Sequence, residues 1–223
     1  MNNFSAIQNR IAALEIKYLR PVNSIKLVAI SKKQSADAIK QAFAAGIHSF
    51  GESYLQEALD KMRLLQQKNI EWHFVGNVQS NKTKIIAENF SWVQSIAQLK
   101  IAERLHAQRP SQLPPLNCLI QVNLDAESSK SGVAPDQLLS LAEGISKLAN
   151  LRLRGLMFLP RAQVNFELQR QTFKKAYQLF TDLKQHGFAI DTLSMGMSED
   201  FEAAIAEGAT MVRIGRALFG ERE

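Results

Sequence analysis

Cysteine and long apolar runs are what this sequence of 223 residues has least of. The single cysteine, Cys118, cannot form a disulfide within the chain, and we expect it to pack as a small core residue rather than act as a nucleophile. Doing without disulfides is typical of a reducing compartment and indicates a cytoplasmic location. No uncharged apolar run is long enough to span a membrane, and the opening Met-Asn-Asn-Phe does not resemble a secretion signal.

Charge of one sign is also not concentrated anywhere in the sequence. Lys and Arg number 27 against 21 Asp and Glu, which gives a formal net charge of +6. Such an excess of positive charge can favour binding of nucleic acid or phosphate. The basic residues are nevertheless scattered among acidic ones, with no basic stripe interleaved with aromatic residues. The sequence therefore favours neither a nucleic acid nor a membrane as partner.

Strand-like and helix-like segments alternate along the whole chain. An amphipathic helix is predicted over 4–18, with Ile7, Ile11, Leu14 and Ile16 near helical spacing. Strand-like runs follow at 26–31, 47–51, 71–76, 91–95, 116–123, 152–158, 191–195 and 210–214, each succeeded by a helical segment. We expect an α/β protein, a (β/α)8 TIM barrel in a single domain over residues 1–223 with an extra N-terminal helix. A doubly wound open sheet would show the same local alternation.

The first predicted strand ends in a lysine. The run IKLVAISKK, residues 25–33, is typical of a buried parallel strand, and Lys32 would stand at its carboxyl end, where barrels and doubly wound sheets collect their chemistry. Burying an ammonium is costly, and the same burial lowers the pKa of a lysine and makes it a nucleophile for aldehydes. We expect Lys33, by contrast, to point to solvent.

The loops after the last two strands have the composition of a phosphate site. Ser194, Ser198, Gly215 and Arg216 would supply hydroxyls, close approach of the backbone and a positive charge, next to the amino end of a short helix. The alternative is that the glycines only permit turns and Ser198 only caps the following helix. A lysine beside a phosphate site suggests a Schiff base with a phosphorylated carbonyl compound, either pyridoxal 5′-phosphate (PLP) or a sugar phosphate in an aldolase.

Several segments together carry a family resemblance. LVAISK, FGESYLQEALDK, EWHFVGNVQSNK, SSKSG, LRLRGLM and LSMGMSEDFEAAIAEGATMVRIGRALFG resemble the pyridoxal phosphate homeostasis proteins, over a stretch from about Leu27 to Gly220. The resemblance implies a barrel like the amino-terminal domain of alanine racemase, with PLP attached covalently to Lys32. It also implies cytoplasmic location, no established catalytic reaction, and a role in balancing free cofactor and amino-acid pools, with enzymes lacking their PLP as possible partners.

The resemblance also completes the set of expected site residues. It places Arg213 opposite the pyridine nitrogen, where a guanidinium disfavours protonation of the ring and weakens it as an electron sink. The family commonly has Asn where this chain has Ser53, so a shorter hydroxyl replaces an amide. No metal site and no catalytic residue are expected, and the chain is expected to be a monomer. The expected cofactor-binding residues are Lys32, Ser194, Met197, Ser198, Arg213, Gly215 and Arg216.

Two other functions compete with cofactor binding and delivery. A PLP-dependent racemase needs a second acid/base on the opposite face of the substrate, which related folds take from a further domain or a partner subunit. We expect no further domain after the last helix, and of the three tyrosines only Tyr54 follows a strand end. His73 lies inside a predicted strand and is expected to be a core or supporting residue. The other candidate is an RNA- or protein-binding barrel that retains an anion site.

Overall fold

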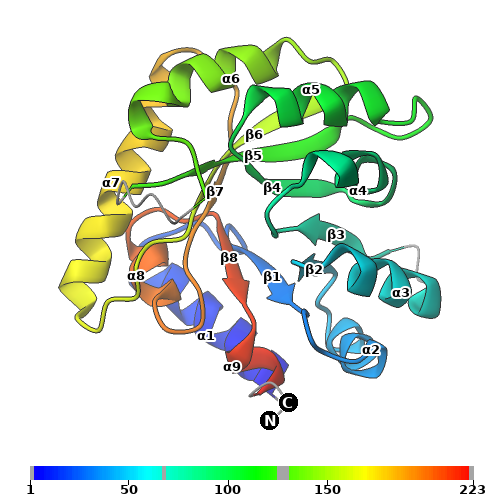
Figure 1. Cartoon of the computed structure of the whole chain (residues 1–223). Helices are drawn as coiled ribbons and strands as arrows, with labels where there is room; N and C mark the ends of the chain where they lie inside the picture. The colour runs from blue at the N-terminus through cyan, green and yellow to red at the C-terminus, as the bar shows by residue number, and fades with distance from the viewer. Residues whose placement is uncertain (1–2, 67–68, 125–130, 221–223) are drawn as a thin grey trace.

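Eight parallel strands form a closed barrel in the computed structural model, which describes residues 3–66, 69–124 and 131–220 (Figure 1). The strand order follows the chain order, and β1 closes the barrel by pairing with both β2 and β8. Each strand lies where the sequence predicts it, with ends that differ by one or two residues, and the doubly wound alternative is wrong. The strands are β1 Lys26–Ile30, β2 Ser49–Glu52, β3 Glu71–Phe74, β4 Trp92–Ile96, β5 Leu116–Val122, β6 Leu151–Phe158, β7 Thr192–Ser194 and β8 Met211–Ile214.

The helices surround the barrel as an outer layer (Figure 1). Local signals in the sequence start some of them: the Ser35 hydroxyl caps α2, and the Asn165 side chain caps the long α7 by accepting from two backbone N–H groups. None of the described helices is long and apolar enough to cross a bilayer. They are α1 Asn3–Lys17, α2 Ala36–Ala44, α3 Leu55–Leu65, α4 Thr83–Asn89, α5 Leu99–Gln108, α6 Leu138–Ser146, α7 Phe166–Gln185, α8 Phe201–Ala206 and α9 Arg216–Phe219, with 3₁₀ turns η1 Ser80–Lys82 and η2 Pro135–Gln137.

The N-terminal helix α1 packs against α8 and α9, so the two ends of the described chain lie close together (Figure 1). Its apolar stripe buries Ile7, Ile11 and Leu14, as the helical spacing predicts. Ile16 does not belong to the stripe: it is 72% exposed, and the buried position next to it is taken by Glu15. The Glu15 carboxylate accepts the backbone N–H groups of residues 23 and 25, and so holds the turn that leads into β1.

Alternation along the strands separates a barrel interior from an outer apolar layer. In β1, Leu27 and Ala29 belong to the layer between strands and helices, whereas Val28 and Ile30 belong to a separate cluster inside the barrel. Successive strand residues point to opposite faces, so a strand that must fill both layers is apolar throughout. The interior cluster consists of Val28, Trp92, Leu119, Met157 and Met211, with Ile30 packed against it.

Candidate functional site

A cavity of about 480 Å³ opens at the carboxyl ends of the strands. Its volume lies within the range of small-molecule sites, and its position is the one that barrels use for chemistry. Six of the seven residues predicted from the sequence line it. The seventh, Ser194, lies outside the lining and contacts Arg213, which is one of the six. The lining consists of Ile30, Lys32, Ser53, Val75, Met157, Leu159, Ala162, Gln163, Gln169, Met197, Ser198, Glu199, Asp200, Arg213, Gly215 and Arg216.

Lys32 reaches the cavity because of its place in the alternation of β1. Val28 and Ile30 point into the barrel, and Lys32 follows Ile30 at the same spacing of two residues, just past the end of the strand. Both Ile30 and Lys32 line the cavity, and Lys32 is only partly exposed. Lys33, which has the opposite parity, is exposed, as the sequence predicts. The lysine thus continues the inward-facing alternation of β1, in the turn that follows the strand.

Arg213 enters the same cavity from β8 and is buried. Its guanidinium donates to the Ser194 hydroxyl at 2.6 Å and to the Phe158 carbonyl at 2.7 Å. Burial lowers the pKa of Arg213 to about 10, with the nearby Asp200 carboxylate acting in the other direction. The group therefore stays charged at neutral pH, in an orientation fixed by two hydrogen bonds.

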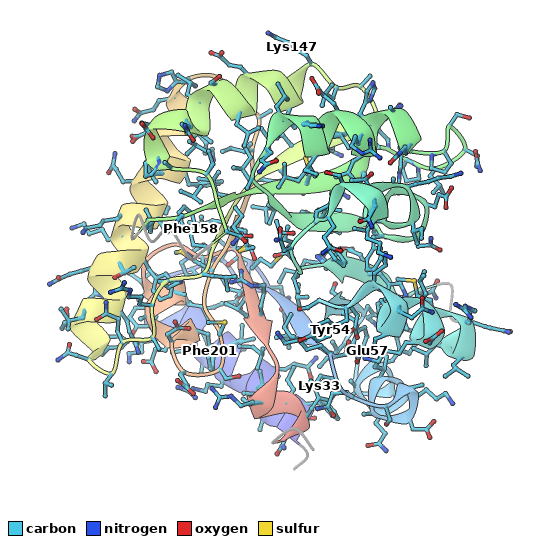
Figure 2. The ribbon with its side chains drawn as sticks, viewed as in Figure 1. Lys33, Tyr54, Glu57, Lys147, Phe158 and Phe201 are labelled. Carbon is cyan, nitrogen blue, oxygen red and sulfur yellow. The ribbon has the colours of Figure 1, made fainter. Side chains whose placement is uncertain are left out.

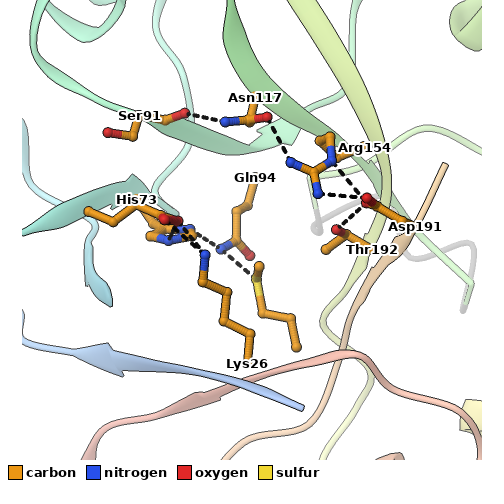
Figure 3. Close-up of polar contacts among 10 residues, drawn as sticks. Lys26, His73, Ser91, Gln94, Asn117, Arg154, Asp191 and Thr192 are labelled. Carbon is orange, nitrogen blue, oxygen red and sulfur yellow. Dashed lines mark hydrogen bonds and ion pairs between the residues drawn. The ribbon is translucent and has the colours of Figure 1, made fainter. Parts of the chain in front are cut away.

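Behind Arg213, polar side chains continue through the interior of the barrel. The Ser194 hydroxyl donates to the Gln94 carbonyl oxygen at 2.7 Å, and the Gln94 amide nitrogen lies 2.9 Å from Nδ1 of His73 (Figure 3). Because that amide can only donate, Nδ1 accepts and the proton of a neutral His73 resides on Nε2, 2.9 Å from Glu71. Burial lowers the pKa of His73, which favours the neutral form, although Glu71 opposes this. His73 is thus an interior residue, as predicted.

The two loops of the predicted phosphate site contact each other. The Ser198 hydroxyl accepts the backbone N–H of Ala217 at 3.3 Å, which joins the loop after β7 to the one-turn helix α9. Ser198 therefore does not cap α8, and the alternative interpretation of this residue is wrong. Within the first loop, Asp200 accepts the Met197 N–H at 2.6 Å. Arg216 forms an ion pair with Glu199 at the rim, where both side chains are more than half exposed.

Sequence reasoning missed the part of the cavity wall that follows β6. Leu159, Ala162 and Gln163 line the cavity from the loop between β6 and α7. Gln169, in the first turns of α7, donates from its amide to the Gln163 carbonyl at 2.7 Å and holds this loop. These residues carry neither charge nor a motif, so only the three-dimensional contact identifies them. Ser53, the residue that departs from the family pattern, also lines the cavity.

Other residues singled out from the sequence lie elsewhere. Tyr54 precedes α3 and is 53% exposed, outside the cavity lining. Cys118 is buried in β5, and burial raises the pKa of its thiol to about 12, which fits the predicted core role. In the SSKSG segment, residues 128–130 lie outside the described residues. Across 3–66, 69–124 and 131–220, no group of three or more His, Cys, Asp or Glu side chains is arranged to hold a metal ion.

Comparison with known proteins identifies the family of the chain. The sequence profile of the family "Alanine racemase, N-terminal domain" matches residues 3–223. A pyridoxal phosphate homeostasis protein of Pseudomonas aeruginosa is 53% identical over 200 residues, which cover 90% of this chain and 86% of that protein. The corresponding protein of Escherichia coli is 45% identical over 225 residues, covering 100% of this chain and 96% of that protein.

Solved structures give the same picture. PipY of Synechococcus elongatus, solved with PLP bound, superposes with a TM-score of 0.84 at 34% identity and covers 95% of this chain and 99% of its own. An alanine racemase of Clostridium difficile, at 17% identity and a TM-score of 0.70 over 56% of its length and 96% of this chain, shares the fold. The chain therefore belongs to the alanine racemase N-terminal domain family and, within it, to the pyridoxal phosphate homeostasis proteins.

Proposed function

We propose that the chain binds PLP in the cavity at the carboxyl ends of the strands and keeps the cofactor available to other enzymes, without catalytic turnover of its own. The observation that carries the proposal is that one cavity gathers Lys32, Arg213, Arg216 and Ser198. These are an amine for an aldehyde, a fixed cation for a ring nitrogen, and a cation and a hydroxyl for a phosphate. The PLP-bound relative PipY supports the same ligand.

The proposed attachment is a Schiff base on Lys32. The bond joins Nζ of Lys32 to the aldehyde carbon of PLP, and the aldehyde oxygen leaves as water. When bound, PLP supplies an aldehyde carbon that forms imines and a pyridine ring that accepts electrons. The role of Arg213 is to donate a hydrogen bond to the ring nitrogen, and its charge disfavours protonation there. Ser194 orients Arg213 from behind, and Ser198, Gly215 and Arg216 surround the phosphate, with Met197 against the cofactor.

Binding without turnover follows from what the site supplies. A ring nitrogen held unprotonated by Arg213 is a weak electron sink, and loss of one proton-transfer partner alone costs roughly 10²–10⁴ in rate. Tyr54, the tyrosine that follows a strand end, lies outside the cavity lining. We further propose that the whole chain, residues 1–223, acts as one PLP-binding domain, as a monomer in the cytoplasm, with enzymes that lack their PLP as partners.

Borohydride reduction tests the attachment. Purified protein loaded with PLP should retain the cofactor after reduction and denaturation, and peptide mass mapping should place the adduct on Lys32. Lys32→Arg should abolish the adduct, whereas Lys40→Arg, on the exposed surface of α2, should leave it unchanged. An adduct on Lys33 or Lys130 with Lys32 unmodified would overturn the assignment.

Deuterium exchange tests the absence of turnover. Protein loaded with PLP is incubated with single-enantiomer amino acids in deuterated water, and incorporation at Cα is followed. We expect incorporation no faster than with free PLP at the same concentration. Rapid incorporation that depends on Lys32 would support the racemase alternative instead.

A further inference from the structure

Three charged side chains form a cluster beneath the turn that carries Lys32. Lys61 comes from α3, Glu52 from the end of β2 and Glu57 from the first turn of α3. Nζ of Lys61 donates to Oε1 of Glu52 at 2.7 Å and to Oε1 of Glu57 at 2.6 Å. The Lys61 and Glu52 side chains are only 7% and 0% exposed. We call these three residues the Lys61 clamp; none of them lines the cavity.

The Lys61 clamp contacts the main chain on both sides of Lys32. Before Lys32, Nζ of Lys61 donates to the Ser31 carbonyl at 2.6 Å, and the Ser31 hydroxyl donates to Glu52 at 2.6 Å. After Lys32, the Lys33 backbone N–H donates to the Glu57 carboxylate at 2.5 Å, and Figure 2 shows these two residues near each other. The backbone of Lys32 is thus fixed at both neighbours by side chains from other elements.

The turn that the clamp holds is strained. Lys33 has a φ of 60°, in the left-handed region, where a residue with a Cβ atom costs roughly 1–2 kcal/mol. The left-handed conformation of Lys33 is part of a tight turn, which the Gln34 backbone N–H closes by donating to the Ser31 carbonyl at 3.0 Å. Lys32 therefore lies inside a closed turn whose shape depends on a left-handed residue.

Stability alone does not explain the clamp. Taking charged groups out of water is expensive, and apolar residues of similar volume often stabilise a buried position as well as an ion pair does. Burial raises the pKa of Glu52 even though Lys61 opposes it, and among the described residues Oε2 of Glu52 has no hydrogen-bond partner. The cluster is thus an incompletely satisfied set of charges whose contacts converge on one short stretch of main chain.

We propose that Lys61 and Glu57 are positioning residues for Lys32, which hold the Ser31–Lys33 turn in the shape that directs the Lys32 amine into the cavity. The inference rests on the proposed function, because it concerns the bond between Lys32 and PLP. Since the clamp lies outside the cavity lining, its loss acts on formation of that bond. The contacts to the ring and the phosphate are left in place.

Two ligands distinguish an effect on bond formation at Lys32 from an effect on the contacts to the ring and the phosphate. PLP can bond to Lys32, whereas pyridoxamine 5′-phosphate, which has an amine in place of the aldehyde, binds only through its ring and phosphate. The variants are Lys61→Met and Glu57→Ala, and the matched control is Asp60→Ala, an exposed residue of the same helix that pairs with Arg63. Covalent labelling of Lys32 is followed by quenching with borohydride at intervals and measuring the modified peptide.

We expect labelling of Lys32 to slow by about tenfold or more in both variants, because a small misplacement of a reacting group is costly. The dissociation constant of pyridoxamine 5′-phosphate should change by less than about threefold, since its contacts remain. Hydrogen exchange of the backbone amides of residues 31–34 in PLP-free protein should be faster in both variants than in the wild type. Asp60→Ala should match the wild type in all three measurements.

Each outcome bears on a different claim. Labelling at the wild-type rate in both variants would overturn the inference, and so would an equal loss of affinity for the two ligands, which would mean a general structural role. If Lys61→Met does not fold, Glu57→Ala decides, because Glu57 is less buried, at 27% exposed. Wild-type protein that binds PLP without any adduct on Lys32 would instead overturn the proposed attachment.

Discussion

The two mouths of the barrel use the same kinds of residues in opposite ways. At the amino-terminal mouth, a cavity of about 330 Å³ is lined by charged side chains that neutralise each other. Lys26 donates to both oxygens of Glu71 at 2.5 and 2.9 Å, and Arg154 forms two bonds with Asp191 at 2.9 and 2.6 Å (Figure 3). Both cations also lie over the Trp92 ring, at 5.3 and 4.9 Å from its centre.

At the carboxyl-terminal mouth, the most buried cation has no such bond to a carboxylate among the residues that the structure describes. The two hydrogen bonds of Arg213 go to neutral oxygens, those of Ser194 and Phe158, and Asp200 acts on it only through space. Arg216 does pair with Glu199, but at an exposed rim where an ion pair contributes little. The comparison teaches that paired charges close one end of the barrel, whereas a fixed cation without a bonded counter-ion prepares the other end for a ligand that accepts hydrogen bonds.

The largest expected difference is in PLP affinity, between variants that replace a cation at one mouth or at the other by a neutral residue. Arg213→Met should weaken PLP binding by about 10- to 100-fold, because a hydrogen bond to a charged group contributes about 1.5–3 kcal/mol. Arg154→Met, at the amino-terminal mouth, should leave PLP affinity within about twofold and only lower the melting temperature. Equilibrium titration and thermal unfolding check both. Equal losses of affinity would remove the distinction between the mouths.

Substitutions in the loops after β7 and β8, which form the proposed phosphate site, should weaken PLP binding by a smaller amount. Arg216→Ala and Ser198→Ala should each weaken PLP retention by about 1–1.5 kcal/mol, or about five- to tenfold, because each removes one partner of the phosphate. Retention is measured as the rate of PLP loss to a trapping enzyme. Lys175→Ala, which removes a lysine from the exposed face of α7, is the matched control. If both variants retain PLP as well as this control does, the phosphate lies elsewhere.

Removing the counter-ion at the rim should act in the opposite direction. Glu199 competes with a phosphate for Arg216, so Glu199→Gln should tighten PLP binding by about two- to threefold, as expected for an exposed pair. The gain should fall with added salt, because screening already weakens the pair in the wild type. Affinity measured at two salt concentrations tests this, and weaker binding by the variant would show that Glu199 helps to hold the cofactor.

Glu71, at the amino-terminal mouth, should make the stability of the fold depend on pH. Replacing it should leave PLP binding almost unchanged. Burial would raise the pKa of Glu71, but His73 and Lys26 outweigh it and lower the pKa from 4.5 to about 2. The resulting stability is fully present above pH 4.5 and is lost as pH falls through 2. Glu71→Gln should therefore unfold more easily than the wild type at neutral pH, with the difference vanishing toward pH 2.

Denaturant unfolding from pH 7 to pH 2 measures this difference, and PLP affinity is measured at pH 7 alongside. We expect the affinity of Glu71→Gln to stay within about twofold of the wild type. A loss as large as that of Arg213→Met would mean that the polar side chains through His73, Gln94 and Ser194 couple the two mouths.

The fold was predictable because its signals are local. Strand-like and helix-like segments alternate along the sequence, which predicts an α/β fold. Eight such units match a barrel, but the same alternation left a doubly wound sheet open, and the closure of β1 onto β8 decides between them. Six of the predicted site residues meet at one cavity because they lie at the carboxyl ends of strands or in the turns just after them. Lys61 and Gln94 escaped prediction, since a lysine in a charged helix and a glutamine in a strand look ordinary until the contacts across the barrel are known.

The period-two spacing of β1 also restricts how this protein can evolve. Lys26, Val28, Ile30 and Lys32 share one face, so inserting or deleting a single residue within β1 would turn Lys32 toward the helices and bring Ser31 or Lys33 to the cavity. A deletion would still place a lysine, Lys33, at the cavity, but either change would shift the Ser31–Lys33 turn away from its contacts with Lys61 and Glu57. Length variation among descendants should therefore be rare between residues 26 and 32.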